Sequence, residues 1–406
     1  THILPEDKFL LAVLSRKMNI VGGSIEELNE KLNNKFIGHT KFVSDIFSDL
    51  FKKEQEGKVG EHKSKISEIR SLNEGVLERA SFHSNKNALK FLKRLRDGPT
   101  SSHPAEKSIN DFYSILPKIL EGCSEVPMPN SAVENLVNFI ESSKARESFL
   151  GLFAENKKFL ELLLRIFGSS NFISDTLIKQ PGLIDIVKDT ESIYRFKNKE
   201  NLHKEISQIL KTRNTYKAQQ DILRRFKQGE ELRIGIRYII GEVDIEGTLK
   251  DLSSLAETHV ENACQIAFKK LNTQYGNDTN IPDSFAIIGM GKLGGSEINF
   301  KSDLDLIFVY EDTPNDSLFS GNVVLFYTKI SQLLHELTSE ITSSGYVYKI
   351  DSDLRPEGKS GRMVNSIKSY EDYYKTRART WEQQAMVRAR FIAGNQQTGE
   401  NFINMV

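Results

Sequence analysis

The sequence predicts an α+β protein, in which a large all-helical N-terminal part is followed by a small α/β domain. Before about residue 280, apolar residues recur every three or four positions, the spacing of amphipathic helices. Compact apolar runs, typical of buried strands, begin only after that point. A chain of 406 residues is also long for one domain, so about two or three units are expected.

The first hundred residues are expected to form helices joined by polar segments. Residues 25–53 alternate apolar and charged side chains at helical spacing. Residues 53–72 are strongly polar, which predicts a solvated helix or a linker. Residues 98–104 hold two prolines and several small polar residues, and they are the clearest linker.

Two further helical blocks follow, over residues 110–196 and 202–275. In the second block we expect the long helices to break near Gly229 and near Gly241, because glycine weakens a helix interior.

The last part of the chain predicts a small unit in the order strand, strand, helix, strand. The expected strands are Phe285–Met290, Leu304–Tyr310 and Tyr346–Asp351. Between the second and third, apolar residues from Phe319 to Ile341 form one stripe at helical spacing.

Composition excludes several classes of protein. Lys+Arg and Asp+Glu both number 55, so the formal net charge is zero, which argues against bulk attraction to nucleic acid or to an anionic membrane. The sequence contains no apolar run of about 18 residues, the length that would predict a membrane span. Cys123 and Cys264 form neither a metal-ligand spacing nor a disulfide framework, which fits a reducing cytosol and a cytoplasmic protein.

The strongest chemical signal is a group of three aspartates. Asp303 and Asp305, two positions apart on a strand, project from the same face, with Leu304 buried on the other. Neighbouring carboxylates repel each other unless a cation lies between them, and hard oxygen ligands suit Mg²⁺. Asp351, on the next strand, would supply the third carboxylate of a metal site. We therefore predict Asp303, Asp305 and Asp351 as metal ligands and catalytic residues.

A glycine-rich turn precedes these aspartates and predicts a place for phosphates. Gly294 and Gly295 offer backbone amides without side-chain obstruction, Ser296 adds a hydroxyl donor and Lys292 adds a positive charge. Arg355 has two alternatives, a phosphate contact or a structural ion pair. The candidate nucleotide-binding residues are Lys292, Gly294, Gly295, Ser296, Arg355 and Lys359.

These residues lie in a longer pattern that resembles a known family. The segment Gly289-Met-Gly-Lys-Leu-Gly-Gly-Ser-Glu-Ile-Asn-Phe-Lys-Ser-Asp-Leu-Asp-Leu-Ile-Phe308 resembles the signature of the bifunctional glutamine synthetase adenylyltransferase/adenylyl-removing enzymes. Further matching segments, in family order over roughly residues 110–395, are Leu223–Lys227, Leu232–Gly235, Leu252–Glu257, Leu354–Gly361 and Thr380–Arg390.

The resemblance implies a nucleotidyltransferase domain of the polymerase-beta type that uses Mg²⁺ and ATP. It implies transfer of AMP to a tyrosine of glutamine synthetase, which regulates nitrogen assimilation. The PII signalling protein as a partner and glutamine as an effector are implied in the same way, and no nucleic-acid or membrane partner is expected.

The family has two homologous catalytic halves, and the half that is present decides the direction of the reaction. Residues 146–156 with 180–184, and the version of the tryptophan motif at residues 380–385, resemble the C-terminal, adenylylating half. Residues 297–300 and the start of the signature at Gly289 look more like the adenylyl-removing half. Adenylylation is the favoured prediction, and phosphorolytic removal of AMP, giving ADP, is the alternative.

We expect the chain to be a piece of a longer protein, because both ends look cut. The resulting division is a helical tail of a preceding catalytic half (1–55), a helical linker (56–108), a helical lead-in (109–279), the catalytic domain (280–395) and the start of a following helical domain (396–406).

One departure from the family pattern concerns Asp353, which stands where the family usually has an arginine. The extra carboxylate raises the local negative charge, so a lower affinity for ATP or an altered metal preference is expected. Asp353 is also the one sequence feature that supports a second alternative, a module that binds nucleotide or PII without catalysis.

Three other positions have both a functional and a structural interpretation. Arg233 and Arg237 share a helical face, and ordinary ion pairing is favoured over a nucleotide contact. Trp381 is expected in a helix that continues to Arg390, with packing favoured over a role in the site.

Overall fold

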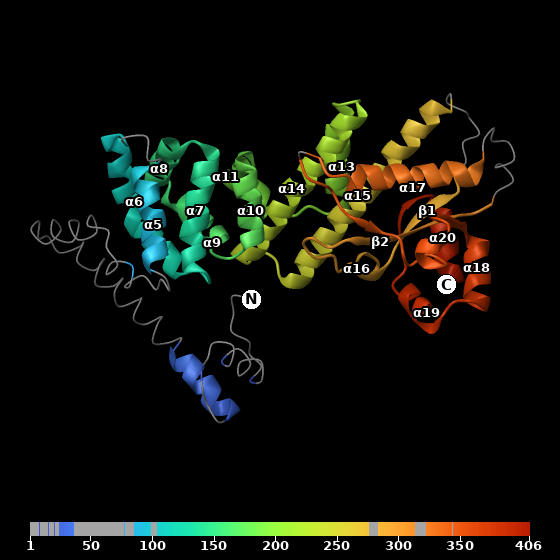
Figure 1. The fold of residues 1–406 in the computed structure, drawn as a ribbon, viewed down its shortest axis with the longest axis horizontal. Coiled ribbons are helices and arrows are strands. Elements are labelled where there is room, and N and C mark those ends of the chain that lie inside the picture. Colours follow the sequence, from blue (N-terminus) through green and yellow to red (C-terminus); the bar gives the residue numbers. More distant parts are fainter. Residues whose placement is uncertain are drawn as a thin grey trace, which may run out of the picture. The chain divides into compact units, whose positions relative to one another are not determined.

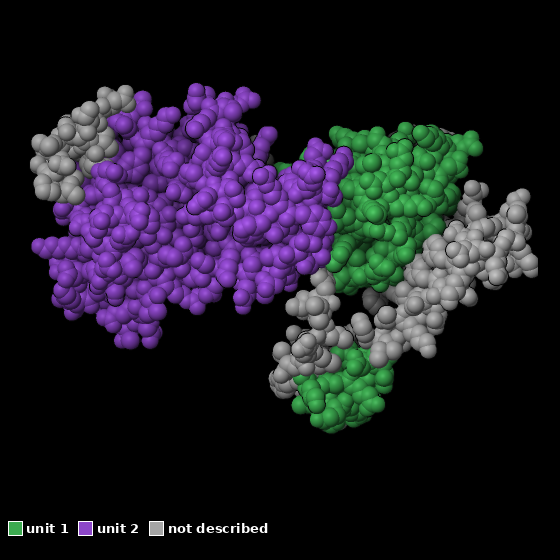
Figure 2. All heavy atoms as spheres, turned by 180° about the vertical axis from the view of Figure 1, so that it is seen from behind, with its two compact units in different colours: residues 1–184 green, residues 185–406 purple. Residues whose placement is uncertain are grey.

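The computed structural model describes residues 8, 15, 20, 24–35, 77, 85–98, 104–275, 283–312, 322–342 and 344–406. The chain divides into two compact units, Thr1–Ile184 and Asp185–Val406, which Figure 2 colours separately. The predicted linkers at 53–72 and 98–104 lie largely outside the described residues. Within the described ranges, no helix is both long and apolar enough to cross a membrane.

The first unit is helical throughout its described part. Residues 25–35 are helical, and an antiparallel array of short helices follows (Figure 1). Its helices are α5 (Asn85–Asp97), α6 (Glu106–Ser124), α7 (Pro129–Ser143), α8 (Arg146–Glu155), α9 (Lys157–Phe167), α10 (Asn171–Lys179) and the 3₁₀ helix η2 (Pro181–Leu183). Phe139, Phe153 and Phe167 are fully buried at the centre of this array, which confirms the predicted helical character.

The second unit begins with helices. These are α11 (Ile184–Lys188), α12 (Thr190–Tyr194), α13 (Lys199–Lys211), α14 (Tyr216–Ile240) and α15 (Ile245–Gln274). The predicted break at Gly241 is confirmed, because Gly241 ends α14 in the left-handed conformation with φ of 85°. The predicted break at Gly229 is wrong. The helix runs through Gly229, where a Cβ atom would approach the Ile186 side chain to 3.2 Å, so this glycine allows close packing.

A mixed sheet with helices follows. Its strands are β1 (Phe285–Gly289), β2 (Leu304–Tyr310), β3 (Ile350–Asp351), β4 (Val364–Ser366) and β5 (Arg390–Gly394). The accompanying helices are α16 (Gly291–Gly294), α17 (Val323–Ser339), the 3₁₀ helix η4 (Gly358–Ser360), α18 (Ile367–Thr376), α19 (Thr380–Met386) and α20 (Gln396–Met405). The α+β class is therefore confirmed.

The strands are arranged around β2. On one side β2 pairs with β1 in the antiparallel sense, and β1 pairs with β5. On the other side, the start of β2 pairs with β3 and its end pairs with β4, both in the parallel sense.

Alternation along the strands gives the sheet two covered faces (Figure 1). Phe285, Ile287 and Phe308 belong to the core formed with α15 and α17. The intervening residues, among them Ile288 and Ile307, belong to a smaller core on the opposite face, formed with α18, α19 and α20.

Three predictions for this region need correction. The third strand is two residues long, because the amides of Val347 and Tyr348 donate to Thr338 O at the end of α17 and not to a strand partner. The sequence reading missed β4 and β5. The helix that contains Trp381 ends at Met386, so Arg390 lies on a strand.

The predicted domain boundaries differ from the compact units. The second unit begins at Asp185, inside the predicted lead-in 109–279. Residues 396–405 form α20, which packs on β1 and β5 through the buried Phe402. The division of a longer protein into halves and linker stays a prediction.

Candidate active site

The three predicted carboxylates lie at one end of the sheet. Leu304 is fully buried in the core with α15 and α17, so Asp305, its neighbour on β2, faces the opposite side. Asp305 and Asp351 are directly paired residues of β2 and β3. Side chains at paired positions of neighbouring strands project from the same face, so these two carboxylates are adjacent.

The charges of all three aspartates interact. Burial raises the pKa of Asp305, and repulsion from Asp351 and from Asp303 raises it further, while Lys292 acts in the opposite direction. Asp303 and Asp351 are exposed and Asp305 is half-buried. The arrangement thus concentrates negative charge that the nearby lysine only partly offsets, a pattern common at functional sites.

Carboxylate oxygens suit a hard divalent cation, and the repulsion of Asp305 by Asp351 and Asp303 is not fully offset by Lys292. Among the described residues, however, no group of three or more His, Cys, Asp or Glu side chains is arranged to hold a metal ion as it stands. Asp351 Oδ1 accepts a hydrogen bond from the Asp353 amide at 2.8 Å. Binding of Mg²⁺ by all three aspartates stays a prediction.

The glycine-rich turn forms α16, and its amides are mostly engaged. Gly294 N donates to Met290 O at 2.9 Å, Gly295 N to Gly291 O at 3.1 Å, and Ser296 N to Leu293 O at 3.1 Å. These three predicted nucleotide-binding residues follow Gly291, which lies against Asp305, but their amides donate within the turn. Whether they contact a nucleotide stays a prediction.

Gly291, which sequence reasoning did not single out, lies closest to the carboxylates. Its φ is +51°, and a Cβ atom there would come within 2.2 Å of Asp305 Oδ2. In addition, Met290 N donates to Asp305 O at 2.8 Å. The turn and the start of β2 are therefore in direct contact, and a side chain at residue 291 would be strained and would displace the Asp305 carboxylate. The glycine spacing of the signature was the available signal.

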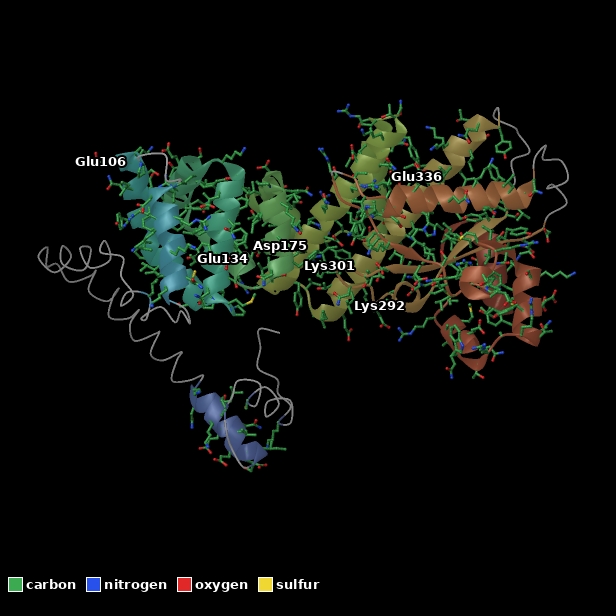
Figure 3. The ribbon with its side chains drawn as sticks, viewed as in Figure 1. Glu106, Glu134, Asp175, Lys292, Lys301 and Glu336 are labelled. Atoms are coloured by element: carbon green, nitrogen blue, oxygen red, sulfur yellow. The ribbon has the colours of Figure 1, made fainter. Side chains whose placement is uncertain are left out.

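Two lysines flank this region. Lys292 is an exposed residue of α16, and Lys301 is an exposed residue of the segment that leads into β2; Figure 3 labels both. Lys292 is the basic group that acts on the pKa of Asp305, so it is the best placed of the predicted phosphate ligands.

Arg355 and Lys359 lie in the loop after β3. The buried Arg355 guanidinium donates to the backbone carbonyls of Ser352, Lys359 and Gly361, at 2.7, 3.1 and 3.2 Å. Its main contacts thus brace the loop. Lys359 is 84% exposed, and its Nζ lies 3.3 Å from Asp353 Oδ2.

Arg233 and Arg237 are held in buried ion pairs. Arg233 Nε lies 2.7 Å from Glu230, and Arg237 Nη1 lies 2.8 Å from Asp251. The favoured interpretation, ion pairing, is therefore confirmed. Trp381 is 52% exposed, so the favoured interpretation of packing is wrong for this residue.

A family model described as glutamate-ammonia ligase adenylyltransferase matches residues 160–405. The chain is 29% identical to the bifunctional glutamine synthetase adenylyltransferase/adenylyl-removing enzyme of Thioalkalivibrio sulfidiphilus, with 81% of the chain and 35% of that protein covered. It is 31% identical to the protein of that description in Shewanella oneidensis, with 77% and 34% covered. The chain thus spans about a third of the length of these curated relatives. On the match to the family model, the chain belongs to the glutamate-ammonia ligase adenylyltransferase family.

Proposed function

We propose that the second unit is a nucleotidyltransferase of the polymerase-beta type that transfers AMP from ATP to a tyrosine of glutamine synthetase. The observation that carries the proposal is the direct pairing of Asp305 with Asp351, with Asp303 close enough to affect the same pKa. The acceptor protein comes from the printed descriptions of the relatives.

The residues would divide the work as follows. Asp303, Asp305 and Asp351 would hold Mg²⁺, which would neutralise phosphate charge and act as a Lewis acid at the α-phosphate. Asp351 is exposed and so accessible to an acceptor protein. It would take the proton of the tyrosine phenol, whose free pKa is about 10. The phenolic oxygen then bonds to the α-phosphorus, the bond to the β-phosphate breaks, and pyrophosphate leaves.

The reverse chemistry is the second candidate, because the relatives' description includes an adenylyl-removing activity. In that reaction, phosphate attacks adenylyl-tyrosine and ADP is released. Regulation by glutamine and by the PII signalling protein belongs to the proposal for the full-length protein. So does a cytoplasmic location, which is consistent with the free, buried Cys123 and Cys264.

The double variant Asp303→Asn/Asp305→Asn tests the proposal. We expect loss of labelled-AMP transfer to glutamine synthetase, loss of Mg²⁺ binding measured by calorimetry, and an unchanged circular dichroism spectrum. Asp283→Asn/Asp312→Asn is the matched control. These exposed residues lie just before β1 and just after β2, at the end of the strand pair away from Asp303 and Asp305. Retained transfer by the first variant would refute the assignment. Release of ADP from adenylylated glutamine synthetase with phosphate, without forward transfer, would select the second candidate.

A further inference from the structure

Arg390 connects the glycine-rich turn to the helical layer beneath it. It is the first residue of β5 and is paired with Gly289 of β1. Its Nη2 donates to Leu293 O at 2.7 Å, and its Nε donates to Gly294 O at 3.0 Å. Both carbonyls belong to the C-terminal end of α16, where a cation is favourable, and Leu293 O also accepts from Ser296 N.

Glu257 of α15 holds the guanidinium in place. Glu257 Oε1 accepts from Arg390 Nη2 at 2.5 Å, and the glutamate side chain is only 9% exposed. Its other oxygen, Oε2, lies 3.0 Å from Lys199 Nζ. A buried carboxylate with two cations is well compensated, so Arg390 has a fixed anchor on its far side from the turn.

A second contact from α15 supports the same turn. Ser253, four residues before Glu257 and so on the same helical face, accepts a hydrogen bond from Ile298 N at 3.0 Å. The approach is close on the β5 side as well, because a Cβ atom at Gly294 would lie 1.8 Å from Arg388 O. The turn is therefore fixed from α15 and from the segment that enters β5.

We infer that Arg390, anchored by Glu257, is a positioning residue that fixes α16 against Asp305. The hydrogen bonds of Arg390 go to Glu257 and to the turn, and none of these partners is one of the three aspartates. It acts on the carbonyls of Leu293 and Gly294, and the other end of the same short helix is Gly291, which lies against Asp305 Oδ2. The inference rests on the proposed function for its effect on catalysis, whereas its effect on the turn is independent of that function.

Arg390→Ala is compared with Arg390→Lys and with Lys199→Ala in the whole chain. Arg390→Ala removes two hydrogen bonds to the turn and one cation from Glu257. Lys199→Ala removes the other cation from Glu257 and leaves the turn contacts intact, so it is the matched control. Lysine at position 390 keeps the charge but not the two differently placed donors, Nε and Nη2.

The first readout is amide hydrogen exchange of residues 290–298, which needs no activity. Because hydrogen bonds to a charged group are stronger than neutral ones, we expect exchange in this segment to rise by about tenfold or more in Arg390→Ala. Arg390→Lys should give a smaller rise, and Lys199→Ala should give none. Equal exchange of the turn in Arg390→Ala and Lys199→Ala would overturn the inference.

The second readout is the split between kcat and KM. Misplaced reacting groups cost up to about 10²-fold in rate, so kcat for AMP transfer should fall by roughly 10–100-fold in Arg390→Ala with little change in the KM for glutamine synthetase. A wild-type chain that transfers no AMP in either direction would contradict the proposed function, and hydrogen exchange would still decide the role of Arg390. If Arg390→Ala lost thermal stability but kept the hydrogen exchange of the turn and kcat unchanged, the inference would be wrong and Arg390 would have only a structural role.

Discussion

Two sets of partly or fully buried charges in the second unit differ in how they are compensated. On α14, Glu230 lies 2.6 Å from Lys197 and 2.7 Å from Arg233, so each charge has a partner of opposite sign. At the start of β2, Asp305 is half-buried beside two more carboxylates, and burial and repulsion raise its pKa. Removing one partner of a buried charge pair destabilises the fold, whereas buried charge that repels its neighbours raises the free energy of the folded state and points to a ligand.

The paired set should show the largest effect on stability. Glu230→Gln leaves the Arg233 guanidinium, in a residue that is 1% exposed, without its carboxylate. Breaking a buried pair from one side costs about 3–5 kcal/mol, so the free energy of unfolding should fall by that amount in urea titrations. Glu205→Gln, which removes the more exposed partner of Lys197, is the control and should cost about 1 kcal/mol or less. An equal loss of unfolding free energy in Glu230→Gln and Glu205→Gln would contradict the special role given to the buried pairing of Glu230.

The repelling set should respond in the opposite direction. Because the pKa of Asp305 is raised in the folded state, the folded chain binds this proton more tightly than the unfolded chain, and stability falls as pH rises above about 4. Asp305→Asn removes the carboxylate charge that is unfavourable in the folded state. The melting temperature of this variant should therefore exceed the wild-type value at pH 7 and approach it below about pH 4.

Magnesium sharpens this test. Added Mg²⁺ should raise the melting temperature of the wild type and narrow its difference from Asp305→Asn, because a ligand that binds only the folded state stabilises it. An Asn variant that is less stable than the wild type at pH 7 would show that the carboxylates are compensated without a cation.

The smallest effect on stability is expected at Asp353. Its carboxylate lies 3.3 Å from the exposed Lys359 and 3.7 Å from Arg355. An exposed ion pair contributes about 0–1 kcal/mol, so Asp353→Asn should change the free energy of unfolding by no more than about 1 kcal/mol. The released Lys359 would be free for phosphate, and the KM for ATP should fall severalfold in steady-state kinetics. An unchanged KM would remove Lys359 from the nucleotide site.

Strong local patterns made much of this unit predictable from sequence. The apolar run Leu304–Tyr310 matches β2 at both ends, and the stripe before Ile341 matches α17 within the described residues. Strand β4 is three residues long and lies in a polar neighbourhood, so it has no period to detect. Strand β5 follows α19 closely, and the polar residues before it continue a helical pattern up to Arg390.

The site shows the same limit. The spacing of Asp303 and Asp305 predicted that they lie close together, and Asp303 does raise the pKa of Asp305, although it lies just before β2. Pairing of Asp305 with Asp351 depends on the register between strands about 45 residues apart. The contact of Arg390 with the turn joins residues nearly a hundred positions apart. Sequence spacing indicates which residue types are present, whereas such contacts depend on the packing of α15, β1 and β5.

The brevity of β3 has a consequence for how this site is assembled and kept. Strand β3 pairs with β2 through only two residues, Ile350 and Asp351, while β2 itself is seven residues long. Short edges open locally at far lower free energy than the interior of a sheet. Local opening of β3 would move Asp351 away from its paired residue Asp305, so occupancy of the site would be linked to fraying of this strand end.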